Sequence, residues 1–422
     1  MKTKLILLVL LFVQLAFSQQ RTCGTMEMHE QAMANPEFVQ QRTEMLQKVN
    51  AELLRMQSSS FRQPNVTIRI PVAIHFPAGS EVNRACLEDL AQNQVNILNN
   101  DYSGTNTDAT NWDPSWSNVG GIYPGTVPSG LDIVFEIATK NHPAVSGRVD
   151  GQKLVTIGSN RSNFLPSANG DYDPNYAGYI NFVVRNIPGN VLGFSPLGGQ
   201  PTNGYAVVIN RSAFGTGSGC PVGFTPGAPY NLGRTLTHEL GHFLNLNHPF
   251  ISASGSASDC TPDDADGIDD TPKQAAATYG NPAPGSISSC DVDKQVLSTN
   301  YMDYTNDAGM YMFTVRQIQV SQAFYNVIAA DLKQNVLSVD PLTFNGFDIY
   351  PNPIKNNLNI DLKESAQDLK LNIVDISRRT IFNKQYSNVL NIQIDNINAT
   401  TGIYFVSINA DGKTFTKKVI VE

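Results

Sequence analysis

The chain has 422 residues, of which 41% are hydrophobic and 16% are charged, and its formal net charge is −8 at pH 7. This length exceeds a single compact core and predicts two or three domains after processing. The negative charge argues against nucleic acid and anionic membrane surfaces as partners.

Residues 1–18 have the pattern of a signal peptide. Two lysines precede the apolar run 5–17, and the small residues Ala16 and Ser18 occupy the positions that a signal peptidase reads. We therefore expect export. No later stretch is long and apolar enough to predict a transmembrane segment in the mature protein.

Residues 19–60 are predicted to be a pro-region, with a helix over 36–54. The main domain, 61–338, shows strands and helices in mixed order. Strands are expected at 67–76, 131–139, 179–184 and 205–209, and helices at 86–99 and from about Asn231. Irregular Gly- and Pro-rich loops are expected at 117–130 and 186–204. This order predicts an α+β fold in which helices back a twisted mixed β-sheet.

Three histidines and one glutamate lie within residues 238–248. His238 and His242 are four residues apart, so on a helix they lie one turn apart and can bind one zinc ion. His248 becomes a third ligand if the helix ends and the chain turns back. Asn245 stands at that turn and tolerates the left-handed conformation that it requires.

Glu239, between the two helical histidines, is the candidate general base for a zinc-bound water. A buried amphipathic helix that happens to carry histidines is the alternative, but three of the six histidines of the chain fall in this window. The other three, His29, His75 and His142, are isolated and do not suggest a site.

Five cysteines are compatible with disulfides in an exported protein, and one of them has no partner. Cys23 lies in the pro-region. Because a thiolate is a good zinc ligand, Cys23 could occupy the position of the catalytic water and keep a precursor inactive. The alternative is an unpaired thiol without a function.

An acidic loop follows the metal motif. Five aspartates between residues 263 and 270 repel one another unless a cation or water screens them, which suggests a calcium site or a solvated loop. Cys260 and Cys290 bracket this loop and are expected to form a disulfide.

The composition changes near Val339, and residues 339–345 are a predicted linker. Residues 346–422 consist of short alternating segments, which predict a small antiparallel β-sandwich. This domain contains neither His nor Cys, so we expect no chemistry from it.

The metal motif resembles that of the metzincin metallopeptidases, and within them the pappalysin branch. Residues 300–304, followed by Asp307 and Met310, look like the Met-turn of that branch. The resemblance implies that Met302 forms the floor beneath the zinc, and that Tyr304 stabilises the tetrahedral intermediate. It also implies a latency function for Cys23, which stands in a matching Arg-x-Cys-Gly.

The same resemblance implies calcium ligands in the acidic loop, at Asp266, Asp270 and Thr271. Asp307 would lie in a pocket for a basic substrate side chain. Asn245 replaces the usual glycine, and Gly309 replaces a cysteine that relatives often carry, so one family disulfide is absent. The pairing of Cys86 with Cys220 is then an assumption.

The tail resembles the type A sorting domain of the type IX secretion system, through residues 347–353, 402–406 and 417–421. It implies export from a diderm bacterium to the medium or the cell surface, with the secretion machinery as a partner. The hypothesis is a secreted, latent zinc endopeptidase acting on proteins or peptides. The alternatives are an inactive surface adhesin or binding module on the same fold, and a zinc hydrolase of another bond.

Overall fold

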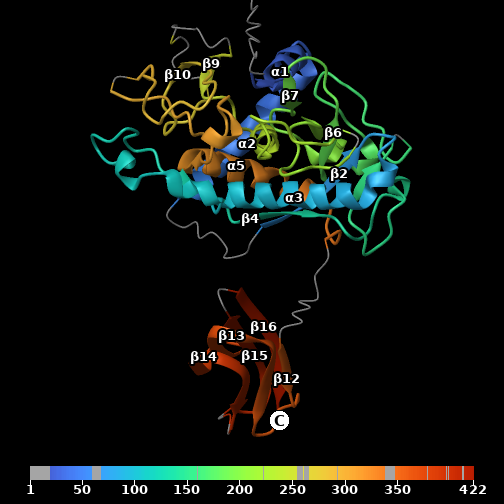
Figure 1. Ribbon diagram of the computed structural model, residues 1–422, viewed down its shortest axis with the longest axis vertical. Helices are drawn as coiled ribbons and strands as arrows, with labels where there is room; N and C mark the ends of the chain where they lie inside the picture. Colours follow the sequence, from blue (N-terminus) through green and yellow to red (C-terminus); the bar gives the residue numbers. More distant parts are fainter. Residues whose placement is uncertain are drawn as a thin grey trace, which may run out of the picture. The chain divides into compact units, whose positions relative to one another are not determined.

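The computed structural model describes residues 20–58, 68–158, 160–221, 223–253, 260, 266–291, 293–337, 347–377, 379–395, 397, 399–410 and 413–422. The predicted signal peptide and the predicted linker lie outside the described residues. The chain forms two compact units, Met1–Leu337 and Ser338–Glu422 (Figure 1). The precise domain boundaries proposed from the sequence stay predictions.

The first unit contains five helices among its described residues. They are α1 (Thr25–Met33), α2 (Pro36–Gln57), α3 (Arg84–Ser103), α4 (Arg234–Phe243) and α5 (Val315–Ile328). Its strands are β1 (Thr22–Cys23), β2 (Ile68–Phe76), β3 (Pro128–Ser129), β4 (Ile133–Ile137), β5 (Val155–Ile157), β6 (Ile180–Arg185), β7 (Val191–Phe194), β8 (Ala206–Asn210), β9 (Phe250–Ser252), β10 (Gln274–Ala276) and β11 (Phe313–Thr314).

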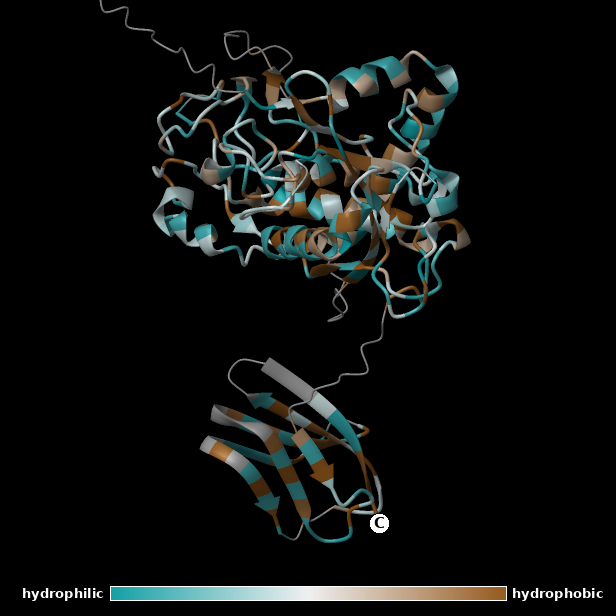
Figure 2. Cartoon of the chain, turned by 45° about the vertical axis from the view of Figure 1, so that its right-hand side comes forward, coloured by the Kyte–Doolittle hydropathy of each residue, from teal (hydrophilic) through white to brown (hydrophobic). Residues whose placement is uncertain are grey.

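Seven of the described strands form a mixed sheet in the order β1-β7-β8-β6-β2-β4, with β5 also paired to β2. Strands β8, β6, β2 and β4 run parallel, and β7 is antiparallel to β8. The central strand β2 is buried from Ile70 to Phe76, as expected for a parallel strand covered on both faces. Figure 2 shows hydrophobic residues gathered on these central strands.

Helices α3 and α4 cover one face of the sheet. α3 packs against β4 and β5, α4 packs against β7 and β8, and the two helices contact each other. Figure 1 shows α3 as a long helix running beside the sheet. The helices and the sheet share one hydrophobic core, which includes Ile74, Leu98, Val207 and Leu240. The α+β architecture expected from the sequence is therefore confirmed.

Three strands of the sheet, β1, β5 and β7, were not expected. β7 lies inside the stretch 186–204, which its glycines and prolines had marked as irregular. β7 forms the edge to which β1, a strand of the predicted pro-region, adds in parallel. Helix α2 of the pro-region packs against α5, where the Asn326 amide donates to Glu52 over 2.6 Å.

The second unit contains β12 (Phe347–Tyr350), β13 (Leu358–Asp375), β14 (Thr380–Ile394), β15 (Gly402–Ala410) and β16 (Lys413–Val421), all antiparallel. β14 pairs with both parts of the long strand β13, whereas β12 and β15 pair with its first and second parts. Hydrophobic and hydrophilic residues alternate along these strands (Figure 2). The inward residues, including Phe347, Leu371 and Val406, form a separate core. The expected antiparallel tail domain is confirmed.

Candidate metal centre

Helix α4 carries the central part of the site. It begins after Gly233, whose φ of 77° only glycine adopts readily, and all ten of its residues are buried. His238, Glu239 and His242 therefore lie in the interior of the protein rather than on its surface. Buried polar groups need partners, so the surroundings of these side chains determine their chemistry.

The chain turns sharply after α4. Asn245 has a φ of 73°, the left-handed conformation, and the Leu246 N–H donates back to the Gly241 carbonyl over 2.9 Å. This turn brings His248 to the helix. Its Nε2 atom lies 3.2 Å from Nε2 of His238 and 3.0 Å from Nε2 of His242. A tetrahedral zinc ion with bonds of about 2.05 Å would separate its ligand atoms by about 3.3 Å, so the three nitrogens fit that ion.

Backbone carbonyls fix the rings of two histidines. Nδ1 of His238 lies 2.7 Å from the Tyr301 carbonyl, and Nδ1 of His242 lies 2.7 Å from the Leu246 carbonyl. Because a carbonyl only accepts, each Nδ1 carries the proton and each Nε2 presents its lone pair to the centre. Burial lowers the pKa of His242 to about 4 and also lowers the pKa values of His238 and His248, which keeps the rings neutral.

Met302 and Tyr304 lie on the other side of the histidines. Met302 is fully buried beneath α4, and a Cβ added to Gly241 would lie 2.4 Å from its sulfur, so this glycine is what allows the close packing. The Tyr304 ring lies 5.0 Å from the ring of His248. Burial raises the pKa of Tyr304, so its hydroxyl stays a neutral donor. The functions that the sequence suggested for the two residues stay predictions.

The predicted pro-region crosses this centre as an extended strand. Arg21, Cys23 and Thr25 are buried, whereas Thr22 is exposed and Gly24 is half-buried. The alternation is that of a strand with one face toward the enzyme. The strand is held by β7, and the Gly24 N–H donates to the Gly193 carbonyl over 2.9 Å.

Cys23 joins the three histidines. Its sulfur and one nitrogen of each of His238, His242 and His248 lie within 4.8 Å of one another, and no other such group occurs within the described residues. The Cys23 thiol also donates to Oε2 of Glu239 over 3.2 Å. Burial and the Glu239 carboxylate raise the pKa of this thiol, an effect that a bound metal ion opposes.

Glu239 is enclosed by the pro-region. Its Oε2 accepts hydrogen bonds from Cys23 and, over 3.1 Å, from the Thr25 hydroxyl. The same hydroxyl accepts from the Ser195 N–H at the end of β7. Burial raises the pKa of Glu239 to about 7, and the two hydrogen bonds act in the opposite direction. A carboxyl group with this pKa can accept and return a proton near neutral pH.

Asp307 lies in a second buried contact with the pro-region. An Arg21 guanidinium nitrogen lies 2.5 Å from Oδ1 of Asp307, and both side chains are only 1% exposed. The guanidinium also lies over the ring of Tyr230. The carboxylate that the sequence suggested for a substrate pocket thus receives a basic side chain from the chain itself.

The residues expected to bind calcium are bonded to other protein groups. Asp266 accepts from the Thr271 hydroxyl over 2.8 Å, and Asp270 accepts from the Thr314 hydroxyl and the Arg316 N–H at the start of α5. Residues 261–265, with two of the five aspartates, lie outside the described part of the chain. Calcium binding stays a prediction.

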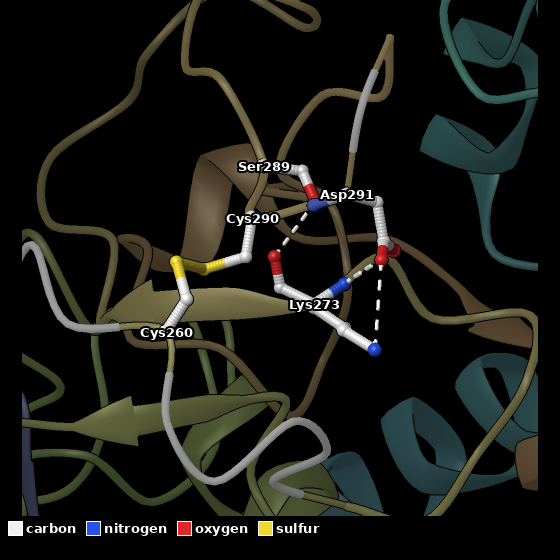
Figure 3. The surroundings of a disulfide bond; sticks show 5 residues. All are labelled: Cys260, Lys273, Ser289, Cys290 and Asp291. Carbon is white, nitrogen blue, oxygen red and sulfur yellow. Dashed lines mark hydrogen bonds and ion pairs between the residues drawn. A yellow bond between two sulfur atoms is a disulfide. The ribbon is translucent and has the colours of Figure 1, made fainter.

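Two disulfides stabilise loops around the site. One joins Cys86 to Cys220 across 134 residues, and the other joins Cys260 to Cys290 across 30 residues. Figure 3 shows Cys290 beside Lys273, whose carbonyl accepts from the Cys290 N–H over 2.9 Å. The remaining cysteine, Cys23, is free and buried.

Sequence reasoning missed three residues of this centre. Arg21 was noted only as part of the motif around Cys23, and Thr25 was not noted at all. The spacing of residues 21, 23 and 25 is the signal that would have placed all three on one face of a strand. Arg234, at the start of α4, has no local signal in the sequence, because charge alone does not reveal that a side chain is buried.

Comparison with known families gives two matches. Residues 226–326 match the peptidase family described as pregnancy-associated plasma protein-A, and residues 348–422 match the secretion system C-terminal sorting domain. The first match contains the metal motif and the Met-turn, and the second covers the tail unit. Both resemblances drawn from the sequence, to the pappalysin branch and to the type IX sorting domain, are confirmed.

Individual relatives agree with these matches. An extracellular metalloprotease of Arthroderma otae is 43% identical over 115 residues, which are 26% of this chain and 40% of that protein. The chain therefore spans about two fifths of the length of that relative. An extracellular metalloprotease of Arthroderma gypseum is 24% identical over 318 residues, 74% of this chain and 85% of the relative.

A solved structure shares the fold of the first unit. A promirolysin mutant of Tannerella forsythia aligns with a TM-score of 0.52 and 25% identity over 73% of this chain and 94% of its own. The sorting domain indicates an extracellular or surface location through type IX secretion. Over the residues that the structure describes, no helix is both long and apolar enough to span a membrane.

Proposed function

We propose that this pappalysin-type chain is a secreted zinc endopeptidase that its own pro-region keeps latent. The observation that carries the proposal is the meeting of three imidazole nitrogens, with Nε2 of His248 at 3.2 and 3.0 Å from those of His238 and His242, beside a thiol that contacts the Glu239 carboxyl group. His238, His242 and His248 would hold the ion. When bound, zinc lowers the pKa of a water molecule to about 7 and polarises a substrate carbonyl.

The side chains of the chain carry out the remaining steps. Glu239 accepts the proton of the attacking water and returns it to the leaving amine. The Tyr304 hydroxyl donates to the oxygen on which negative charge develops. The edge strand β7, which holds the pro-region in the latent chain, offers the same backbone groups to an extended substrate.

Latency follows from the contacts of Cys23 and Thr25. The thiol occupies the position next to the three histidines where the water must bind, and both residues engage the oxygen of Glu239 that would accept its proton. The pro-region therefore blocks the metal position and the base at once. Its helices α1 and α2 add packing against the first unit.

The contact between Arg21 and Asp307 supports a preference for basic side chains. The pocket buries a guanidinium against a carboxylate, and a neutral side chain there would leave the Asp307 charge without a counter-charge. A substrate arginine or lysine replaces Arg21 when the pro-region leaves. Cleavage products of a peptide library would show which side of the cut this residue occupies.

The test uses the full chain with Arg21→Ala, Cys23→Ala and Thr25→Ala, which removes the three side chains that the pro-region places in the site, and measures casein hydrolysis and bound zinc. Hydrolysis should disappear with a chelator and with Glu239→Gln, while Glu239→Gln keeps its zinc. Glu81→Gln is the matched control, because Glu81 is an exposed glutamate outside the site. A folded chain with these three substitutions that binds one zinc ion but hydrolyses neither casein nor a peptide library would refute the proposal.

A further inference from the structure

The metal-bearing helix α4 has no cap of its own. Its N-cap is Gly233, and its first turn contains no acidic residue. Asp307 supplies the cap from the loop that follows the Met-turn. Its Oδ2 accepts from the Leu232 N–H over 2.8 Å and from the Arg234 N–H over 3.3 Å. A carboxylate there is stabilised by the free N–H groups and by the positive end of the helix.

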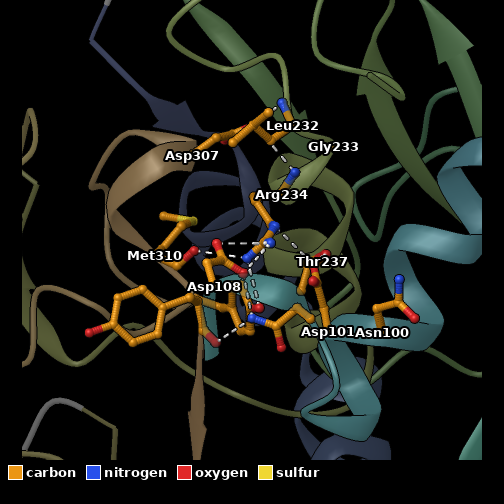
Figure 4. Close-up of polar contacts among 12 residues, drawn as sticks. Asn100, Asp101, Asp108, Leu232, Gly233, Arg234, Thr237, Asp307 and Met310 are labelled. Atoms are coloured by element: carbon orange, nitrogen blue, oxygen red, sulfur yellow. Dashed lines mark hydrogen bonds and ion pairs between the residues drawn. The ribbon is translucent and has the colours of Figure 1, made fainter. Parts of the chain in front are cut away.

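The side chain of Arg234 holds the same loop from the other side. One guanidinium nitrogen donates to the Tyr301 hydroxyl over 2.8 Å and to the Met310 carbonyl over 2.9 Å. Another donates to both carboxylate oxygens of Asp108, over 3.0 and 3.2 Å. Figure 4 shows the guanidinium between Asp108, Asp101 and Met310, with Asp307 at the other end of the Leu232–Arg234 segment.

Through these contacts Arg234 is connected to both halves of the site. Tyr301, which it holds by the hydroxyl, orients the His238 ring through its carbonyl. The backbone N–H of Arg234 donates to the Asp307 carboxylate, which also forms the ion pair with Arg21. Residues 301 and 310 are the two ends of the loop that contains Met302, Tyr304 and Asp307, and Arg234 bonds to both ends.

We propose that Arg234 is a positioning residue that fixes the Asp307 carboxylate relative to the His238 ligand, so that one buried guanidinium sets both substrate preference and cleavage geometry. This inference rests on the proposed peptidase function and on its basic pocket. A guanidinium is suited to the task because it donates in three directions within one plane, whereas an ammonium group cannot reach the same partners together.

The experiment compares Arg234→Lys and Asp108→Asn, each in the full chain with Arg21→Ala, Cys23→Ala and Thr25→Ala, so that no side chain of the pro-region occupies the pocket. Asp108→Asn removes the charge of one partner of the Arg234 guanidinium at a half-buried position. It therefore serves as the second test if the Arg234→Lys chain does not fold. The matched control is Arg148→Lys, which weakens a comparable ion pair, 2.8 Å long, with Glu88 outside the site. The quantities measured are Tm and the ratio of kcat/KM for two peptides that differ only by arginine or citrulline in the pocket position.

The arginine-to-citrulline ratio should fall at least about tenfold in Arg234→Lys, because a displaced carboxylate no longer matches the bound charge. It should fall less in Asp108→Asn and stay unchanged in Arg148→Lys, whatever the Tm of that control. An unchanged ratio in both site variants, with activity lost only in step with Tm, would show that Arg234 is merely structural. If the parent itself does not discriminate between the two peptides, the assignment of the Asp307 pocket is wrong and the inference fails with it. The proposed peptidase function is not affected by this outcome, because the chelator and Glu239→Gln experiments test it.

Discussion

Replacement of Arg21 by alanine should weaken latency without changing the catalytic residues. The change removes one partner of an ion pair whose side chains are both 1% exposed, and leaves the Asp307 carboxylate without its cation. Such a loss costs about 3–5 kcal/mol. Asp307 keeps two backbone donors at the start of α4, so the lower value, about 3 kcal/mol, applies here. The equilibrium between bound and released pro-region should then shift about 150-fold toward release.

The assay is the initial rate of cleavage of a fluorogenic peptide by freshly purified full chain, measured before any self-cleavage is visible on a gel. The rate is expressed relative to the fully processed enzyme. Arg55→Ala is the control, because Arg55 is a more exposed arginine of the same pro-region, paired with Glu52 on the surface of α2. Equal latency of Arg21→Ala and the parent chain would refute the reasoning, as would equal activation by Arg55→Ala.

Three further predictions concern the fold and the base. Burial lowers the pKa of His75 to about 4 from an ordinary 6.5, so the unfolded chain takes up the proton first as the pH falls. The contribution of His75 to the free energy of unfolding is therefore fully present above pH 6.5 and falls by about 3 kcal/mol toward pH 4. Denaturant titrations of His75→Gln should show a weaker dependence on pH. A Cβ at residue 193 would lie 2.7 Å from Cγ of Glu239, so Gly193→Ala should lower kcat of the activated chain by at least about tenfold with little change in KM. Loss of the disulfide in a Cys86→Ala, Cys220→Ala chain should cost about 2–5 kcal/mol of unfolding free energy, because it closes a loop of 134 residues, and an unchanged Tm would contradict this.

The elements that the sequence predicts well are those whose signal is local. The strand expected at 67–76 is β2, those expected at 179–184 and 205–209 are β6 and β8, and the helix expected at 86–99 is part of α3. Each has a continuous apolar run or a helical repeat within its own residues. The metal motif is also local, because one helix and one turn carry all three histidines.

The elements that were missed depend on distant partners. β7 has four residues, two of them Gly193 and Phe194, and it becomes a strand because β8 and the pro-region strand β1 lie on either side of it. Arg21 and Asp307 are 286 residues apart in the chain. No periodicity within either segment indicates that they meet, since tertiary packing alone brings them together.

The acidic loop shows a different limit of sequence reasoning. The resemblance to the pappalysin branch implies that Asp270 is a calcium ligand, and this stays a prediction. In the structure its oxygens accept hydrogen bonds from Thr314 and Arg316 at the first turn of α5. A carboxylate that caps a helix and one that binds a cation have the same sequence signature, because both need an acidic residue in a loop.

The pro-region contacts lie on a short strand and two helices that precede the first strand of the sheet core, β2. A single cut after α2 would therefore separate inhibitor and enzyme as two molecules without breaking any contact between them. Activation then becomes a matter of mass action: the cut chain regains activity only as the fragment dissociates, and the active fraction rises on dilution. A secreted enzyme of this kind would stay inactive at the high concentration near the secreting cell and become active as it is diluted.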